Sequence, residues 1–126
     1  MDPLASLTTS LGEDTLRRMV HAFYQHVRSD DLIGPMYPQD DWQGAESRLA
    51  DFLIYRFGGS PAYLEKRGHP RLRARHFPFP IGTQARDRWL ECMGKAMREV
   101  AVPQAESTLL SAFFAQVADA MRNQPD

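Results

Sequence analysis

His76 is the residue whose type and surroundings best suit metal ligation. Phe77-Pro78 follows it directly, so a helix that carries His76 must end there. The carbonyls of a last helical turn have no partner within the helix, and one of them can accept the imidazole Nδ1–H, which leaves Nε2 free for a metal. No cysteine or second histidine stands at zinc spacing, so a single axial imidazole suits haem iron better than zinc. The alternative is an ordinary surface or capping histidine.

A basic segment, residues 65–76, leads up to this histidine and reads Glu-Lys-Arg-Gly-His-Pro-Arg-Leu-Arg-Ala-Arg-His. Beside a haem ligand, its arginines would meet the two propionate carboxylates. A solvated basic surface and a patch for nucleic acid or anionic lipid are the alternatives. Few aromatic residues interleave with the cations and the formal net charge of the chain is −1, so nucleic-acid binding is disfavoured.

Three aromatic side chains with hydrogen-bond donors fall at positions expected to face inward. Tyr24 lies on an apolar stripe beside Phe23, Trp89 lies on a second stripe, and Tyr37 sits in a Met-Tyr-Pro turn. Core packing explains each of them taken alone. Burying all three without acceptors is costly, however, and a polar ligand between them would remove that cost.

Four apolar stripes with helical spacing must position these residues. They run from Leu16 to Val27, from Trp42 to Phe57, from Ala85 to Val100 and from Leu109 to Met121. No segment alternates with period two for long enough to predict a strand, so the expected fold class is all-α. Glycines and prolines break the region from about 58 to 82 into loop with short helical pieces, one of them opened by Ser60-Pro61. Such a long irregular region needs something to organise it, and a bound group large enough to serve as core is the simplest candidate.

Length and composition bound the remaining options. The chain has 126 residues, which predicts a single domain over 1–126. Hydrophobic residues make up 43% and charged residues 25%, the balance of a globular domain, and no apolar run approaches the roughly 18–20 residues of a membrane span. No signal-like segment opens the sequence and Cys92 is the single cysteine, so a soluble cytoplasmic domain without an internal disulfide is expected.

Three stretches together carry a more specific signal than any of them does alone. They are Phe57-Gly58-Gly59-Ser60-Pro61 through Gly68-His69-Pro70 to Phe79, then Arg86 to Met93, and Tyr37-Pro38 followed by Gly44-Ala45-Glu46. At this spacing the chain resembles the truncated haemoglobins of group II (the O type), which are bacterial two-over-two globins, over nearly its whole length. The resemblance implies a two-over-two helical sandwich around haem b (iron protoporphyrin IX).

The resemblance also implies roles for the residues near the iron. His76 matches the proximal ligand, and Tyr24 and Trp89 match the distal tyrosine and tryptophan that hydrogen-bond a bound ligand. Tyr37 matches a position beside the haem where relatives carry phenylalanine or tyrosine. Ala45 stands where vertebrate-type globins have a distal histidine, so ligand stabilisation falls to Tyr24, Tyr37 and Trp89.

Further positions are implied to line the pocket or contact the haem. Ala45 and Leu49 match distal-helix positions that gate and line the pocket. Contacts with the haem or its propionates are implied for Arg48, Phe52, Tyr63 and Arg75.

The expected function is reversible binding of O₂, and of other diatomic ligands such as NO and CO, at a five-coordinate haem iron. A haem-dependent peroxidase or NO dioxygenase at the same site, served by an unidentified reductase, is the alternative. No distal His–Arg pair of the peroxidase kind is apparent, which places turnover second. A third interpretation is a haem-free helical module whose basic segment docks an anionic partner. Neither nucleic acid nor a membrane is an expected partner, and a monomer or homodimer is expected.

Overall fold

Every regular element that the computed structural model describes is a helix; it describes residues 2–61, 65 and 80–124. The elements in chain order are η1 (Pro3–Ser6), α1 (Leu7–Leu11), α2 (Glu13–Arg28), η2 (Gly34–Met36), α3 (Trp42–Arg56), α6 (Thr83–Glu99) and α7 (Gln104–Ala120). Each of the four apolar stripes ends within one residue of the end of α2, α3, α6 or α7. The predicted all-α class is therefore confirmed. Tyr63, Arg75, His76 and all of the basic segment except Glu65 lie outside the described residues.

Charged side chains at the helix ends explain the bounds of α2 and α3. The Asp41 carboxylate accepts the Gly44 N–H at 3.1 Å, which satisfies one of the unpaired donors of the first turn and starts α3 at Trp42. Helix α2 carries Glu13 in its first turn and Arg28 in its last. This order of charges is the one that the helix dipole stabilises.

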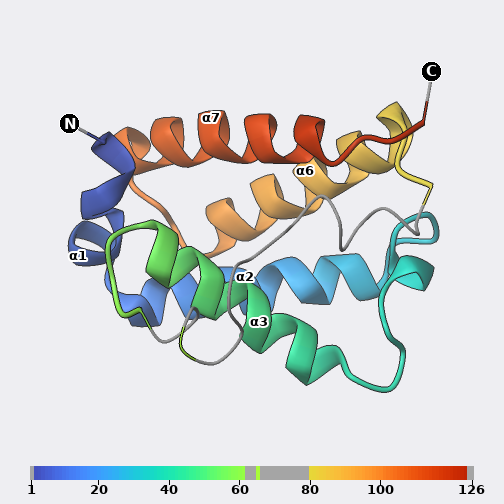
Figure 1. Cartoon of the computed structure of the whole chain (residues 1–126), viewed down its shortest axis with the longest axis horizontal. Coiled ribbons are helices and arrows are strands. Elements are labelled where there is room, and N and C mark those ends of the chain that lie inside the picture. The colour runs from blue at the N-terminus through green and yellow to red at the C-terminus, as the bar shows by residue number, and fades with distance from the viewer. Residues whose placement is uncertain (1, 62–64, 66–79, 125–126) are drawn as a thin grey trace.

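The four long helices form two layers, which Figure 1 shows in side view. Helix α2 packs against both α6 and α3, and α7 packs against α6. The pair α2 and α3 thus faces the pair α6 and α7, which is the predicted two-over-two arrangement. The facing surfaces are apolar and form one core, in which Leu16, Met19, Phe23, Met93 and Leu110 are at most 1% exposed.

The N-terminal segment is fastened to the C-terminal end of α3. The Thr8 hydroxyl donates to the Ile54 carbonyl at 2.9 Å, and the Thr8 N–H donates to the Phe57 carbonyl at 3.0 Å. Gly58 follows with φ +89°, and a Cβ atom there would lie 1.7 Å from the Ala5 carbonyl oxygen. Only glycine fits this close approach, so the Gly58 position is dictated by the docking of the N-terminal segment.

The C-terminal segment is fastened to the residues just before α6. Asn123 Oδ1 accepts the Ile81 N–H at 2.8 Å, and the Asn123 N–H donates to the Ile81 carbonyl at 2.8 Å. These two hydrogen bonds hold the chain that enters α6 against the chain that leaves α7.

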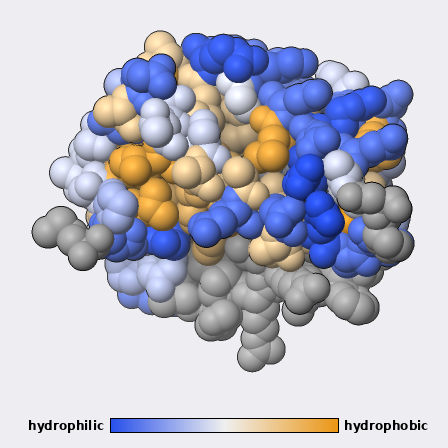
Figure 2. Space-filling view, turned by 90° about the horizontal axis from the view of Figure 1, so that it is seen from above, coloured by the Kyte–Doolittle hydropathy of each residue, from blue (hydrophilic) through white to orange (hydrophobic). Residues whose placement is uncertain are grey.

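The outer face drawn in Figure 2 is largely hydrophilic, with apolar residues in patches among the polar ones. Apolar residues at the surface are normal for a folded protein and need no ligand to explain them. None of the described helices is both long enough and apolar enough to cross a membrane.

Candidate functional site

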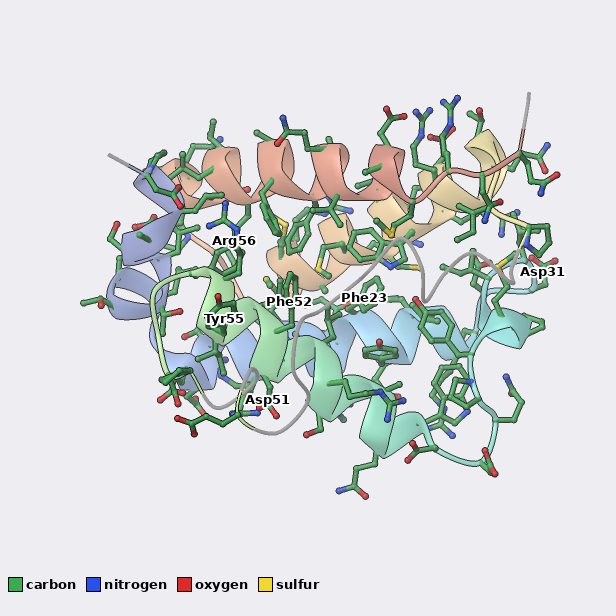
Figure 3. All side chains as sticks on the ribbon, viewed as in Figure 1. Phe23, Asp31, Asp51, Phe52, Tyr55 and Arg56 are labelled. Carbon is green, nitrogen blue, oxygen red and sulfur yellow. The ribbon has the colours of Figure 1, made fainter. Side chains whose placement is uncertain are left out.

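A largely apolar cavity of about 310 Å³ is lined by residues of α2, η2, α3, α6 and α7 and of the segments next to them. The described residues that line it are Tyr24, Ile33, Met36, Tyr37, Pro38, Ala45, Arg48, Leu49, Phe52, Leu53, Ile81, Ala85, Arg86, Trp89, Phe113, Phe114, Val117, Ala118 and Met121. Figure 3 shows Phe52 pointing from α3 toward α6 and α7, whereas Asp51 leaves the same helix on another side. Apolar walls with a few polar groups, at this volume, are typical of a site for a small molecule or cofactor.

The structure brings most of the site residues proposed from the sequence to this one cavity. Its lining includes Tyr24, Tyr37, Ala45, Arg48, Leu49, Phe52 and Trp89. They come from α2, from the turn after η2, from α3 and from α6. The other three, Tyr63, Arg75 and His76, lie outside the described residues.

Tyr24 places a hydroxyl group on the cavity wall. The residue is only 5% exposed, and no hydrogen bond joins its hydroxyl to another of the described residues. Burial, reinforced by the neighbouring Tyr37, raises the pKa of Tyr24 well above its ordinary value, so the phenol keeps its proton and is a neutral donor. A buried hydroxyl without a partner costs about 1–3 kcal/mol, and a ligand that accepts its hydrogen bond would remove that cost.

Tyr37 lies on the cavity wall and contacts the rings of Tyr24 and Trp42. Its ring meets the Tyr24 ring edge-on at 5.5 Å between centroids and stacks on the Trp42 ring at 5.7 Å. Burial raises the pKa of Tyr37, and the neighbouring Trp89 side chain partly offsets that rise. Trp89 is itself held edge-on against Phe23 at 5.0 Å. Packing thus fixes the orientation of all three polar rings on the cavity wall.

Two arginines on the cavity wall are held by carboxylates. Arg48 Nη1 donates to Asp41 Oδ2 at 3.2 Å, so Asp41 both caps α3 and holds this guanidinium. Arg86 Nη1 donates to Asp119 Oδ1 at 2.9 Å, and Arg86 Nε donates to Asp87 Oδ1 at 3.0 Å. The hydrogen bond to Asp119 is the largest cause of a raised Arg86 pKa. Both guanidinium groups are therefore positioned and charged next to apolar space.

Sequence reasoning missed the wall that α7 contributes. Phe113, Val117 and Met121 belong to a stripe that was predicted to be helical, yet they line the cavity. Periodicity identifies an inward-facing stripe but does not distinguish contact with the core from contact with a cavity. Arg86 was part of a recognised motif without an assigned role, and Ile81 carried no signal of its own.

The chemistry of the cavity fits the haem that was predicted from the sequence. Haem is a flat and mostly apolar group that carries two carboxylates and an iron with a polar ligand. The apolar walls match its ring, and the guanidinium groups of Arg48 and Arg86 match its carboxylates. The Tyr24 hydroxyl, which has no partner in the described part of the chain, matches a ligand with partial negative charge.

Comparison with known families and proteins gives one consistent result. The family model described as bacterial-like globin matches residues 9–123, a range that contains every described residue of the cavity wall. Among curated proteins, the chain is similar to the group 2 truncated hemoglobin YjbI of Bacillus subtilis (strain 168). The two are 44% identical over 91 residues, which cover 72% of this chain and 68% of that protein.

Solved structures resemble the whole arrangement of helices. The truncated oxygen-avid haemoglobin of Bacillus subtilis superposes with a TM-score of 0.88 at 37% identity, covering 92% of this chain and 98% of that one. The group II truncated hemoglobin of Bacillus anthracis superposes with a TM-score of 0.91 at 31% identity, covering 100% of this chain and 96% of that one. The likeness therefore extends to the complete set of helices around the cavity.

Proposed function

The chain belongs to the bacterial-like globin family as a group II truncated haemoglobin, and on that premise we propose that it holds haem b in the cavity and binds O₂ reversibly. Membership of the globins implies haem and haem-based ligand binding. When bound, the haem supplies the iron at which diatomic ligands attach. The protein supplies an apolar enclosure, charged groups for the propionates and hydrogen-bond donors for the ligand.

Several residues are proposed to hold the haem. Arg48 and Arg86 are supported by their place on the cavity wall, where they can donate to carboxylates. Tyr63 and Arg75 are proposed from the resemblance alone, and so is His76 as the proximal ligand of the iron.

The Tyr24 hydroxyl is the single observation that carries the proposal of O₂ binding. A ligand such as O₂ would carry partial negative charge on haem iron, and a donor aimed at such a ligand would be worth more than a donor aimed at a neutral one. The hydroxyl is buried, protonated and without a partner among the described residues, so it can donate without breaking another bond. At roughly 1–3 kcal/mol for such a hydrogen bond, it slows the release of O₂ by about one to two orders of magnitude.

Tyr37 and Trp89 are proposed to act together as a second donor group. Both side chains line the cavity, and Trp89 lies near enough to the Tyr37 hydroxyl to lower its pKa. An indole N–H that donates to the Tyr37 hydroxyl is less available to a ligand, and the Tyr37 O–H then remains free to donate. We therefore expect Tyr24 to contribute more to ligand stabilisation than Trp89 does.

The visible absorption spectrum of the purified protein tests the proposed function. The protein is reduced without O₂ and then exposed to air. A haem Soret band that shifts to a stable oxygenated form is the expected result. The lack of a Soret band, even after reconstitution with haem, would overturn the proposal, and rapid conversion to ferric haem would overturn reversible O₂ binding while leaving the cofactor in place.

The rate of O₂ dissociation tests the roles of the donors. Tyr24→Phe is expected to release O₂ about ten- to a hundredfold faster, because one hydrogen bond to the ligand is lost. Trp89→Phe is expected to accelerate release by a smaller factor. Tyr55→Phe removes a hydroxyl from α3 at a residue that is not among the described lining, so it is the matched control. Equal rates in native protein, Tyr24→Phe and Trp89→Phe would contradict the distal-donor role.

Turnover of peroxide, or dioxygenation of NO, is the second candidate function. The observation that favours it is the set of phenol and indole groups on the cavity wall, which can stabilise negative charge developing on a bound oxygen atom. Steady-state consumption of peroxide well above that of an equal concentration of free haem would support it, and consumption equal to that of free haem would contradict it.

A further inference from the structure

Three oxidisable rings lead from the cavity toward the surface of the protein. Tyr24 and Tyr37 line the cavity, whereas Trp42 is not among its described lining residues and is half-buried. The ring centroids lie 5.5 Å apart for Tyr24 and Tyr37, 5.7 Å for Tyr37 and Trp42, and 6.3 Å for Tyr24 and Trp42. At these separations the rings are in mutual contact. Trp42 therefore reaches the ligand cavity through Tyr24 and Tyr37 and is itself only half-buried.

The three rings differ in how easily each can lose an electron and a proton. A tyrosine that gives up an electron must also release its hydroxyl proton, and burial raises the pKa of both Tyr24 and Tyr37, so their protons are held. Trp42 is half-buried and is not among the described residues of the cavity wall, so the N–H proton of its oxidised ring would leave on the side away from the cavity. Of the three rings, Trp42 is consequently the one that is most readily oxidised when electrons are withdrawn from the cavity.

We propose that Tyr37 and Trp42 form an electron path between the cavity and the surface, and that Trp42 is a surface oxidation site for small phenols. The proposal rests on the proposed function, because the haem must be bound for peroxide to react in the cavity. Hydrogen peroxide takes up two electrons and two protons and leaves as two waters. Each electron is drawn from Trp42 by way of Tyr37. A phenol then returns one electron and one proton to the Trp42 radical and leaves as a phenoxyl radical, so two phenols are oxidised for each peroxide reduced.

Arg28 opposes this oxidation. Its guanidinium carbon lies 5.2 Å from the centre of the Trp42 ring, on the face of the indole. A fixed positive charge at that position stabilises the neutral ring and disfavours loss of an electron from it. The two residues thus give opposite expectations, since removing the Trp42 ring should abolish the surface site and removing the Arg28 charge should enhance it.

Spin trapping on the haem-loaded protein tests the proposal. Native protein, Trp42→Phe, Arg28→Gln and Tyr55→Phe are treated with hydrogen peroxide and 2-methyl-2-nitrosopropane, and the trapped radical is located by peptide mass spectrometry. In native protein and in the Tyr55→Phe control the adduct is expected on Trp42. Trp42→Phe is expected to lose the adduct at that position and to slow the oxidation of added phenol. Arg28→Gln is expected to raise the adduct yield by about two- to fivefold, which corresponds to the loss of one exposed cation–π contact.

The outcomes separate this proposal from the proposed function. A normal Soret band and peroxide consumption, combined with an adduct that lies elsewhere in native protein, would overturn the electron path alone. Phenol oxidation by Trp42→Phe at the native rate would also overturn it. A protein without a Soret band would overturn both the proposed function and the electron path.

Discussion

The two halves of α2 use the same apolar stripe for different purposes. In the first half, Leu16, Met19 and Val20 are 0% exposed and meet only the packed core. In the second half, Phe23 is equally buried, but the next residue, Tyr24, carries on the cavity wall a hydroxyl that has no partner among the described residues. One helix thus passes from a region that provides stability to a region that provides chemistry within about two turns.

The comparison shows which part of α2 holds the destabilising polar group that ligand binding needs. An unpaired polar group weakens a core, so it persists only where a ligand can satisfy it. The buried side chains in the first half of α2 are all apolar, and their burial offsets that cost. Stability and ligand binding should therefore respond separately to substitutions in the two halves.

Leu16→Ala should have the largest effect on stability. It removes a completely buried side chain from the first half of α2 and leaves a cavity, so a loss of about 3 kcal/mol in the free energy of unfolding is expected. Urea unfolding followed by far-UV circular dichroism measures it. The O₂ dissociation rate of the folded variant should equal that of native protein. An altered rate would show that the two halves of α2 are not independent.

Tyr24→Phe should accelerate the release of O₂ without lowering the free energy of unfolding. Its free energy of unfolding, measured on the haem-free protein so that no ligand contributes, should be unchanged or higher by up to about 3 kcal/mol, because a buried hydroxyl with no partner among the described residues is removed. The faster O₂ release described above would then accompany undiminished stability. A large loss of stability would mean that the hydroxyl has a structural partner in the empty protein.

Asp30 lies in the turn just beyond α2. Asp30→Asn should lower the free energy of unfolding by less than Leu16→Ala does. The Asp30 carboxylate accepts the N–H groups of Leu32 and Ile33 at 2.9 and 3.0 Å, and a hydrogen bond from Arg88 at 2.9 Å. Burial opposes its ionisation, but these hydrogen bonds outweigh burial and lower the pKa of Asp30. Asparagine keeps an oxygen acceptor for the two N–H groups, but it loses the charge and places an amide nitrogen where the oxygen that accepts from Arg88 stood.

The pH dependence of this variant identifies the contribution of the charge. Because the folded pKa of Asp30 lies below its unfolded value, the ionised carboxylate stabilises the fold above the unfolded pKa, and this stabilisation is lost as the pH falls through the folded pKa. Asp30→Asn should be less stable than native protein near neutral pH, by less than Leu16→Ala. This difference in the free energy of unfolding should disappear at acidic pH. Urea unfolding of both proteins at neutral and at acidic pH measures it. A difference of the same size in acid would rule out ionisation as its source.

Much of the fold and part of the site followed from the sequence. Helical spacing is a local property, because residues three and four apart share a face, and so the stripes predicted the four long helices. Tyr24 and Trp89 could be assigned inward positions on the same ground. Arg48 was expected near the haem carboxylates and does line the cavity, but its ion pair with Asp41 had no local signal. The assignment of His76 as iron ligand stays a prediction, since His76 lies outside the described residues.

The sequence by itself determined which residues form helices, which stripes turn inward and which aromatic donors need a partner. Only the tertiary structure decided that α7 closes the cavity, that Tyr37 stacks on Trp42, and that the Tyr24 hydroxyl has no partner among the described residues. The physical reason is the range of the interactions involved. Hydrogen bonds within a helix act over four residues, whereas the rotation and crossing of whole helices depend on side-chain packing between segments far apart in the chain.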